Sequence, residues 1–236
     1  MPETSEIAHL ERIASNSLYA AGANSATVRY SFEIFQRFMR GTTLLELGPA
    51  EGVMTDLLAT LPFELTLVDG ASQFCEDLKR RHPRATVVHA LFEEFTTEQR
   101  FDNIVLGHVL EHVNDPVDIL RRCRQWLAPG GRVLAAVPNA RSLHRQAAVI
   151  MGMLAIEDEM NAMDRHHGHR RVFNPETYRA AFTQAGLTIE QFGGYWLKPL
   201  ANRQIEEWFT PEMLHAFMKL GERYPDIAGE LYVVAT

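Results

Sequence analysis

The chain has 236 residues, a length at which a single α/β domain is common. With 46% hydrophobic and 22% charged residues it can bury a full core, which excludes a disordered or fibrous protein. Its formal net charge of −7 provides no global basic field, and we therefore expect no nucleic-acid partner.

Cysteine usage and hydropathy suggest where the chain works. Cys75 and Cys123 accompany no secretory signal and no apolar run near the roughly 18 residues that span a bilayer. We therefore expect reduced thiols, a cytoplasmic location and no membrane span. No internal repeat or linker divides the sequence, which predicts one domain over residues 1–236.

Short β-type runs alternate with helical patterns after a helical N-terminal arm, residues 1–40. This alternation predicts a Rossmann-like, doubly wound α/β fold with a mainly parallel sheet and helices on both faces. The segment 139–172 interrupts it and is too long for an ordinary connection, so we expect a lid or substrate wall there. The predicted strands are 43–48, 65–69, 86–90, 103–107, 132–137, 187–195 and 231–235, and the predicted helices are 51–61, 72–82, 116–127 and 175–185.

The arm carries apolar residues at helical spacing, which predicts that it packs over the mouth of a ligand site. These residues are Leu18, Tyr19, Val28, Tyr30, Phe32, Ile34, Phe35 and Phe38.

A glycine loop, residues 44–52, stands where a buried strand ends and a helix begins, the usual ligand crevice of open α/β sheets. Ala50 adds a methyl group, and Glu46 and Glu51 add negative charge, where a dinucleotide would place its pyrophosphate. A ligand with an ammonium group and no phosphate fits better, since Glu46 can pair with it and the backbone is open at Gly48 and Gly52. An adenosyl amino acid has this chemistry. Alternatively, Gly48 only makes a tight turn.

A second carboxylate follows at a suitable spacing. Asp69 ends the run 64–69, and it comes 21 residues after Gly48, about where such folds bind ribose hydroxyls. An Asp at a strand end can instead cap the next helix, but Ser72 is placed to be that cap. We favour the ribose role for Asp69.

The order of motifs resembles that of class I S-adenosylmethionine-dependent methyltransferases, in particular the small-molecule enzymes that include ubiquinone-biosynthesis and sugar methyltransferases. The resemblance covers roughly residues 41–236. It rests on the loop Glu46, Gly48, Ala50 and Gly52, in which alanine replaces the middle glycine, on Asp69, on Phe101-Asp102, on Leu110-Glu111-His112-Val113 and on the Leu-x-Pro-Gly-Gly turn at 127–131.

The resemblance implies a methyltransferase (EC 2.1.1 type) that uses S-adenosyl-L-methionine and releases S-adenosyl-L-homocysteine. It implies a seven-stranded sheet whose last strand, 230–235, is antiparallel beside 187–195. Leu91 and Phe92 would flank the adenine, although Phe92 could be ordinary core. The expected cofactor-binding residues are Glu46, Gly48, Pro49, Gly52, Asp69, Gly70, Leu91, Phe92 and Gly107.

Methyl transfer from a sulfonium asks the protein mainly to align an acceptor and remove its proton. Histidine is the simplest base near neutral pH. His108, just beyond the fourth predicted strand, is our first candidate for the catalytic base. His112 is the second; we expect it on the first turn of the next helix, and it could instead be a structural part of the motif at 110–113.

The segment 165–171 is basic in an acidic chain. Guanidinium groups bind carboxylate or phosphate in a bidentate manner, which suggests an anionic acceptor. Alternatively, the segment is architectural, because 168–173 matches a Gly-His-x-Arg-x-Phe stretch of related methyltransferases. We expect no metal, since His166 and His167 are adjacent and no carboxylate or cysteine at ligand spacing accompanies them. The candidate substrate-binding residues are His144, His166, His167, Arg170 and Arg171.

The preferred function is O-methylation of a small-molecule acceptor, an anionic metabolite or a sugar. The alternatives are a catalytically silent methyltransferase-fold binding protein and an N-methyltransferase. A nicotinamide-dependent reductase is disfavoured by Ala50 and Glu51, and no Gly-x-Ser-x-Gly or His-Glu-x-x-His motif indicates a hydrolase. The methionine-rich stretch 149–163 could line an apolar acceptor pocket or pack in a homodimer.

Overall fold

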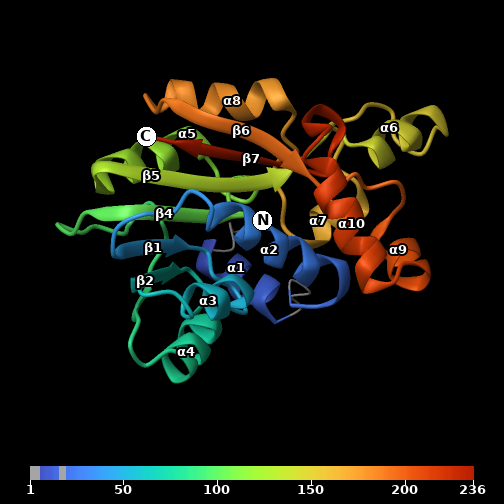
Figure 1. Cartoon of the computed structure of the whole chain (residues 1–236). Coiled ribbons are helices and arrows are strands. Elements are labelled where there is room, and N and C mark those ends of the chain that lie inside the picture. Colours follow the sequence, from blue (N-terminus) through green and yellow to red (C-terminus); the bar gives the residue numbers. More distant parts are fainter. Residues whose placement is uncertain (1–5, 16–19) are drawn as a thin grey trace. The chain divides into compact units, whose positions relative to one another are not determined.

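The computed structural model describes residues 6–15 and 20–236. Within them, seven strands form one sheet in the order β3-β2-β1-β4-β5-β7-β6 (Figure 1). β1 pairs in parallel with β2 and β4, β2 in parallel with β3, and β6 antiparallel with β7. The predicted fold class is therefore confirmed. The strands are β1 (Thr43–Leu47), β2 (Glu64–Asp69), β3 (Thr86–His89), β4 (Phe101–Gly107), β5 (Leu127–Pro138), β6 (Ile189–Tyr195) and β7 (Glu230–Ala235).

The chain divides into two compact units. The first comprises residues 1–107 and 122–133, and the second comprises residues 108–121 and 134–236. The first unit holds β1 to β4. The side chains of β1, β2 and β4 are mostly buried on both faces, as expected for parallel strands, whereas the edge strand β3 has no buried residue.

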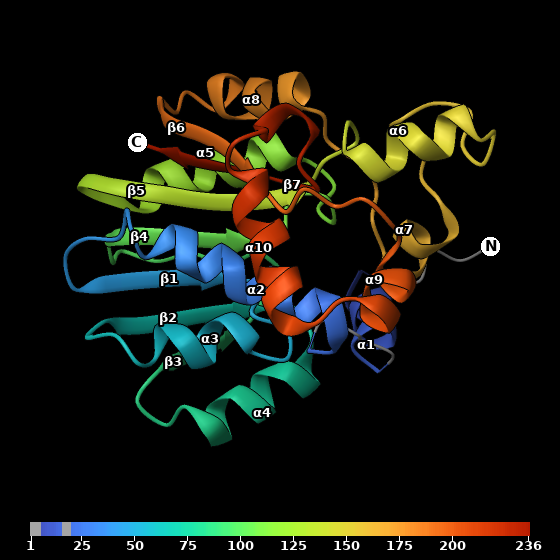
Figure 2. The same ribbon diagram turned by 45° about the vertical axis from the view of Figure 1, so that its right-hand side comes forward.

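The helices of the first unit include the N-terminal arm. Helix α1 (Glu6–Ala14) contacts α4 (Ser72–Arg81), which packs on β2 and β3, and α2 (Gly22–Phe35) contacts α3 (Val53–Leu58) (Figure 2). The described part of the arm is thus helical, as expected, and Tyr30, Ile34 and Phe35 are buried. Leu18 and Tyr19 lie outside the described residues.

The second unit is built on the antiparallel pair of strands β6 and β7, against which α8 (Pro175–Gln184), α10 (Pro211–Gly221) and the 3-10 helix η1 (Pro225–Ile227) pack. The side chain of Asn174 accepts a hydrogen bond from Thr177 N at 2.8 Å, which begins α8 where the Asn-Pro pair predicts. Only glycine fits at 221, because a Cβ there would lie 2.3 Å from Trp196 N. The remaining helices are α5 (Pro116–Trp126), which runs through both units, α6 (Leu143–Ile150), α7 (Ala162–His166) and α9 (Asn202–Trp208).

One predicted boundary is wrong. We expected a turn at 127–131 and a strand from Arg132, but β5 begins at Leu127. Two glycines let the strand start early: Gly130 adopts φ 75°, and a Cβ on Gly131 would lie 2.6 Å from the Phe101 carbonyl oxygen. None of the helices in the described part of the chain is long and apolar enough to cross a membrane.

Candidate active site

The loop after β1 has the backbone of a tight glycine turn. Gly48, Ala50 and Gly52 have positive φ angles of 68°, 47° and 78°. Gly48 N donates to Val68 O at 2.9 Å, and Gly52 N donates to Pro49 O at 2.8 Å. Ala50 therefore holds a left-handed conformation that favours glycine, at the position where the sequence lacks the middle glycine of the resembled motif.

Glu46, near the end of β1, is buried at 2% exposure. Its carboxyl group accepts a hydrogen bond from the Thr55 hydroxyl at 2.7 Å. Burial raises the pKa of Glu46 to about 8, although the Thr55 hydrogen bond opposes the shift. A cation at this carboxyl would favour its ionised form.

Asp69 ends β2 and ties two backbone segments together. Its Oδ2 accepts from Ala50 N at 3.1 Å, and its Oδ1 accepts from Ala71 N at 2.8 Å. Burial raises the pKa of Asp69, although these two hydrogen bonds act to lower it. The expected capping role of Ser72 is wrong: the N-cap of α4 is Ala71, and Ser72 N instead donates to Glu11 Oε1 from α1 at 2.7 Å.

Gly70 and Leu91 come together beside Asp69. A Cβ on Gly70 would lie 3.3 Å from Leu91 Cδ2 and 2.4 Å from Leu10 Cδ1 of α1. Leu91 and Phe92 are half-buried just after β3. The arm therefore covers Gly70, one of the expected cofactor residues.

His108 directly follows Gly107, the last residue of β4. Its φ of 61° lies in the left-handed region, a conformation that costs energy for a residue with a Cβ. Within the second unit, His108 N donates to Ala136 O of β5 at 2.9 Å. This strained position just beyond a strand end matches the place expected for the base.

Polar groups of the second unit surround the His108 ring. Its Nε2 lies 3.2 Å from the Tyr195 hydroxyl, and its Nδ1 lies 3.5 Å from Glu111 Oε1 and 3.8 Å from Glu230 Oε2. Burial lowers the pKa of His108, but Glu111 and Glu230 outweigh burial and the net shift is upward. Both carboxylates therefore lie on the Nδ1 side of the ring.

The expected placement of His112 is wrong. His112 lies in a turn and not on a helix, because Asp115 Oδ1 accepts from Val117 N and Asp118 N and so starts α5 at Pro116. Burial lowers the pKa of His112 to about 4, although Glu111 opposes it.

Glu111 and His169 join His112 in one buried group. One donor atom from each of the three residues lies within 4.8 Å of the others, and the His112 and His169 rings meet edge to face at 4.8 Å. Burial of Glu111 favours its neutral form, but His108 and His112 lower its pKa to about 2. His169 Nδ1 lies 3.6 Å from Asp164 Oδ1.

The two arginines assigned to substrate hold the backbone of this region. Arg170 N donates to Glu111 O at 2.8 Å, and Arg170 Nε donates to His112 O at 2.7 Å. Arg171 donates to the carbonyls of Leu110, Val113 and Asn114. These contacts support the architectural alternative for both residues.

Of the three other candidate substrate residues, His166 and His167 have their ring centres 5.6 Å apart, and His144 lies on another helix. His144 is on α6, where burial, together with Lys198 and Arg145, lowers its pKa to about 2. His166 ends α7 and is exposed, while His167 is half-buried with its ring 6.0 Å from that of His169.

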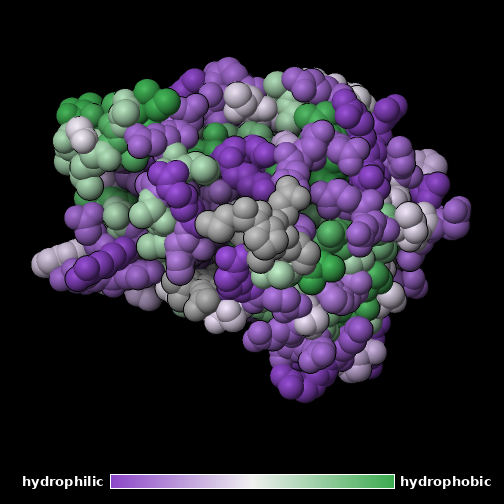
Figure 3. All heavy atoms as spheres, turned by 180° about the vertical axis from the view of Figure 1, so that it is seen from behind, coloured by the Kyte–Doolittle hydropathy of each residue, from purple (hydrophilic) through white to green (hydrophobic). Residues whose placement is uncertain are grey.

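The end of α6 and the segment after it do not form core. Ile150, Met151, Met153 and Ile156 are 87%, 66%, 72% and 60% exposed. Figure 3 shows hydrophobic side chains gathered at the upper left of the rear face, where α6 lies in this view.

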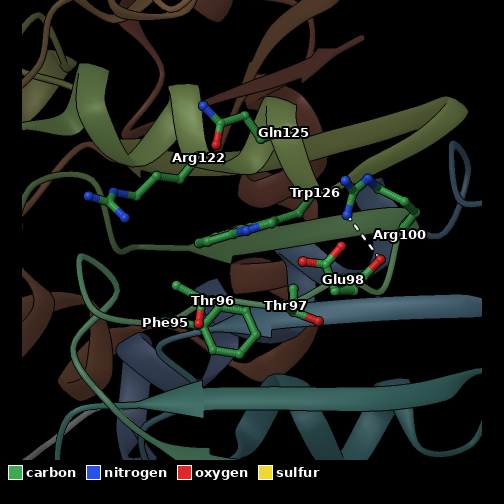
Figure 4. A pocket seen from close by; sticks show the side chains of 8 residues that line it. All are labelled: Phe95, Thr96, Thr97, Glu98, Arg100, Arg122, Gln125 and Trp126. Atoms are coloured by element: carbon green, nitrogen blue, oxygen red, sulfur yellow. Dashed lines mark hydrogen bonds between the residues drawn. The ribbon is translucent and has the colours of Figure 1, made fainter.

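A pocket of about 220 Å³ lies at the opposite end of β4 from His108, around Arg100 and the end of α5 (Figure 4). None of the predicted site residues lines it. Its lining residues are Phe95, Thr96, Thr97, Glu98, Arg100, Arg122, Gln125 and Trp126.

Sequence reasoning missed Tyr195, Glu230 and Lys198. Tyr195 and Glu230 are register partners at one end of the antiparallel pair of strands β6 and β7. Lys198 lies with its Nζ 4.6 Å from the Trp196 ring centre, and burial lowers its pKa to about 8 against the opposing effect of Glu230. A charged residue at the start of the otherwise apolar run 230–235 was the one available signal.

Comparison with known proteins identifies the family. The ubiquinone biosynthesis O-methyltransferase of Xanthomonas euvesicatoria pv. vesicatoria (strain 85-10) is 26% identical over 184 residues, 75% of each chain. That of Pseudomonas paraeruginosa (strain DSM 24068 / PA7) is 25% identical over 171 residues, 69% of this chain and 71% of its own.

Solved structures agree on the fold. A SAM-dependent methyltransferase of Thermotoga maritima, described as a possible histamine N-methyltransferase, superposes with a TM-score of 0.65 at 14% identity, covering 97% of this chain and 99% of its own. The N-methyltransferase NodS of Bradyrhizobium japonicum WM9, in complex with S-adenosyl-L-homocysteine, gives 0.59 at 18% identity, covering 96% and 95%. The family model described as "Methyltransferase domain" matches residues 20–191, more than half of the chain. This chain therefore belongs to the methyltransferase-domain family.

Proposed function

We propose that this methyltransferase domain transfers the methyl group of S-adenosylmethionine to a hydroxyl oxygen of a small molecule. When bound, the cofactor supplies a methyl group on a positively charged sulfur, which makes that methyl an electrophile. The curated relatives reported above are O-methyltransferases, which favours oxygen over nitrogen as the acceptor atom.

The residues of the first unit fit this cofactor. Glu46 and Asp69 are buried carboxyl groups at the ends of two paired parallel strands, and the tight turn through Gly48 and Gly52 follows the first of these strands. Gly52 itself is packed against Leu78 and Arg81. Glu46 would hold the ammonium group, and Asp69 would hold ribose hydroxyls. Gly70, Leu91 and Phe92 would border the adenine, with Pro49 and Gly107 beside the methionine part.

His108 is the proposed base, and its ring environment is the observation that carries this assignment. Glu111 and Glu230 face Nδ1, so a neutral imidazole keeps its proton on Nδ1 and offers Nε2 as a proton acceptor. The Tyr195 hydroxyl is already within reach of Nε2. An acceptor hydroxyl at Nε2 would lose its proton to His108 as the methyl arrives.

The hypothesis of an anionic acceptor is weakened, because the guanidinium groups of Arg170 and Arg171 donate to backbone carbonyls. We therefore propose a hydroxylated small molecule, such as a phenol or a sugar. A homodimer packed through the methionine-rich stretch 149–163 stays a prediction, which sedimentation can check.

The test is direct. The purified chain is incubated with S-adenosylmethionine carrying a deuterated methyl group and with a panel of phenols, sugars and amines, and products are read by mass spectrometry. We expect label on a hydroxyl compound and thermal stabilisation by S-adenosylhomocysteine. Stabilisation without transfer to any acceptor in a metabolite extract would favour the catalytically silent alternative, and label on amines alone would contradict oxygen as the acceptor atom.

A further inference from the structure

We propose that Glu111, His112 and His169 bind one divalent transition-metal ion of the Zn²⁺ class. One donor atom from each residue lies within 4.8 Å of the other two. Two imidazoles and one carboxylate form a known ligand set for catalytic zinc, which leaves a coordination position open. The proposal departs from our sequence-based expectation of no metal.

The buried carboxylate of Glu111 faces imidazole rings and no basic side chain of Lys or Arg in the described residues. Glu111 is 1% exposed, and neither of its oxygens accepts a hydrogen bond from a described residue. The nearest imidazole nitrogens, His108 Nδ1 and His112 Nε2, are 3.5 Å and 3.9 Å from Oε1. Because a buried carboxylate is most stable beside an opposite charge, a cation bound between Glu111 and the imidazoles would stabilise this arrangement.

Groups behind both imidazoles are arranged as around metal-bound histidines. His169 Nδ1 faces Asp164 Oδ1 at 3.6 Å, which leaves Nε2 for a metal. Asp164 is itself fixed by Arg145 Nη1 at 3.1 Å and by Asn161 N at 2.9 Å. The His112 ring hydrogen-bonds with the Gly168 backbone.

The two ligand-bearing segments, 110–114 and 168–171, are already fastened together. Arg170 donates to the carbonyls of Glu111 and His112, and Arg171 donates to three carbonyls of 110–114. An ion would therefore find the two ligand-bearing segments already held together and would not need to order a flexible loop.

The role of the ion in catalysis rests on the proposed function. A divalent ion lowers the pKa of an oxygen that it binds. An acceptor hydroxyl bound to the ion would lose its proton to solvent more readily, and its oxygen would then bond the methyl carbon while the sulfur–methyl bond breaks and leaves a neutral thioether. Metal binding itself is independent of this role and is tested by itself.

The experiment uses the full chain, freed of metal with a chelator and titrated with Co²⁺ and then Zn²⁺. We expect one ion per chain, Co²⁺ absorption in the visible typical of four or five ligands, and displacement by Zn²⁺. Glu111→Gln and His169→Gln should each weaken binding by more than about 100-fold, and Asp164→Asn by about 10- to 100-fold. The exposed His166, three residues from His169, provides the control His166→Gln, which should bind as the wild type does.

The outcomes separate the two proposals. A Co²⁺ spectrum that is the same in Glu111→Gln, His169→Gln and wild type would overturn the site, as would equal loss in His166→Gln. Circular dichroism shows which variants fold, and if Glu111→Gln does not, His169→Gln carries the test. If the chain binds S-adenosylhomocysteine but no metal ion, the metal site is refuted and the proposed function stands. If it binds the ion but no adenosyl ligand, the proposed function is refuted and the metal site stands.

Discussion

The Oδ2 atom of Asp69 accepts a hydrogen bond from Ala50 N at 3.1 Å, so the carboxylate that ends β2 holds the loop that follows β1. The same carboxylate accepts from Ala71 N through Oδ1. One side chain therefore fixes the glycine turn and the start of α4 together. Any ribose bound at Asp69 would meet a group whose position is already set by two backbone N–H donors.

Replacing Asp69 by Ala should weaken S-adenosylhomocysteine binding by about 1 to 3 kcal/mol, the scale of hydrogen bonds to a charged acceptor. Calorimetric titration measures this loss, and thermal unfolding without ligand measures the separate effect on the loop. A lower unfolding temperature with unchanged affinity would make Asp69 a structural tie only and remove it from the ribose site.

Ala50 offers a test of backbone strain. The φ angle of 47° destabilises the folded state by roughly 1 to 2 kcal/mol when the residue is alanine. Glycine avoids this strain, but its greater freedom in the unfolded chain lowers stability by about 0.5 to 1 kcal/mol. Ala50→Gly should therefore raise the free energy of unfolding in urea by about 0.5 to 1 kcal/mol. The control is Ala180→Gly, in the right-handed helix α8, which should lower it by a similar amount. Destabilisation by both would contradict the strain.

Glu46 should make cofactor binding depend on pH. Its pKa of about 8 means that the carboxyl is mostly neutral below that pH in the free protein. Because an ammonium group binds the carboxylate form, binding releases a proton, and affinity should rise with pH by up to about tenfold per unit below pH 8. Titrations with S-adenosylhomocysteine in buffers of different ionisation enthalpy check both the slope and the proton release. Glu46→Gln should bind more weakly and without this slope; a flat profile in the wild type would refute the assignment.

Arg171 should prove structural. Arg171→Ala leaves the carbonyls of Leu110, Val113 and Asn114 without their donor, and we expect a loss of roughly 2 kcal/mol in the free energy of unfolding. Arg165→Ala, an exposed arginine of the same basic segment, should change stability little. A raised acceptor KM in Arg171→Ala with unchanged stability would instead restore the anion-binding role.

Local patterns predicted the fold well because they report on burial and turn chemistry. Alternating apolar runs located all seven strands, and the Asn174-Pro175 pair located the start of α8. Helices α9 and α10 were not predicted, since residues 196–229 lie outside the βαβ alternation. The early start of β5 depends on Gly131 lying against the Phe101 carbonyl, a contact that no local pattern encodes.

Only part of the candidate site could be predicted from the sequence, because local patterns do not report contacts between distant segments. The glycine loop, Asp69 and His108 stand at strand ends, where topology alone indicates a ligand crevice. Glu111 and His169 meet across 58 residues of sequence, and the guanidinium of Arg170 makes that meeting possible by reaching His112 O at 2.7 Å. The basic segment 165–171 suggests an anion site when only its sequence is known, but Arg170 and Arg171 within it donate to backbone carbonyls.

His108 itself decides the proposed chemistry. If Nε2 takes the proton of an acceptor hydroxyl, His108→Ala should lower kcat by about 10²- to 10⁴-fold, the usual contribution of a positioned base. Affinity for S-adenosylhomocysteine should stay within a few-fold, since the residues proposed to bind the adenosyl group do not include His108. Tyr195→Phe, which removes only the hydroxyl near Nε2, is the matched control and should cost far less. Co²⁺ binding distinguishes a catalytic base from a metal ligand. His108→Ala should keep the Co²⁺ spectrum of the wild type, whereas His169→Gln should lose it. Near-normal kcat in His108→Ala would leave alignment of the acceptor as the source of the rate.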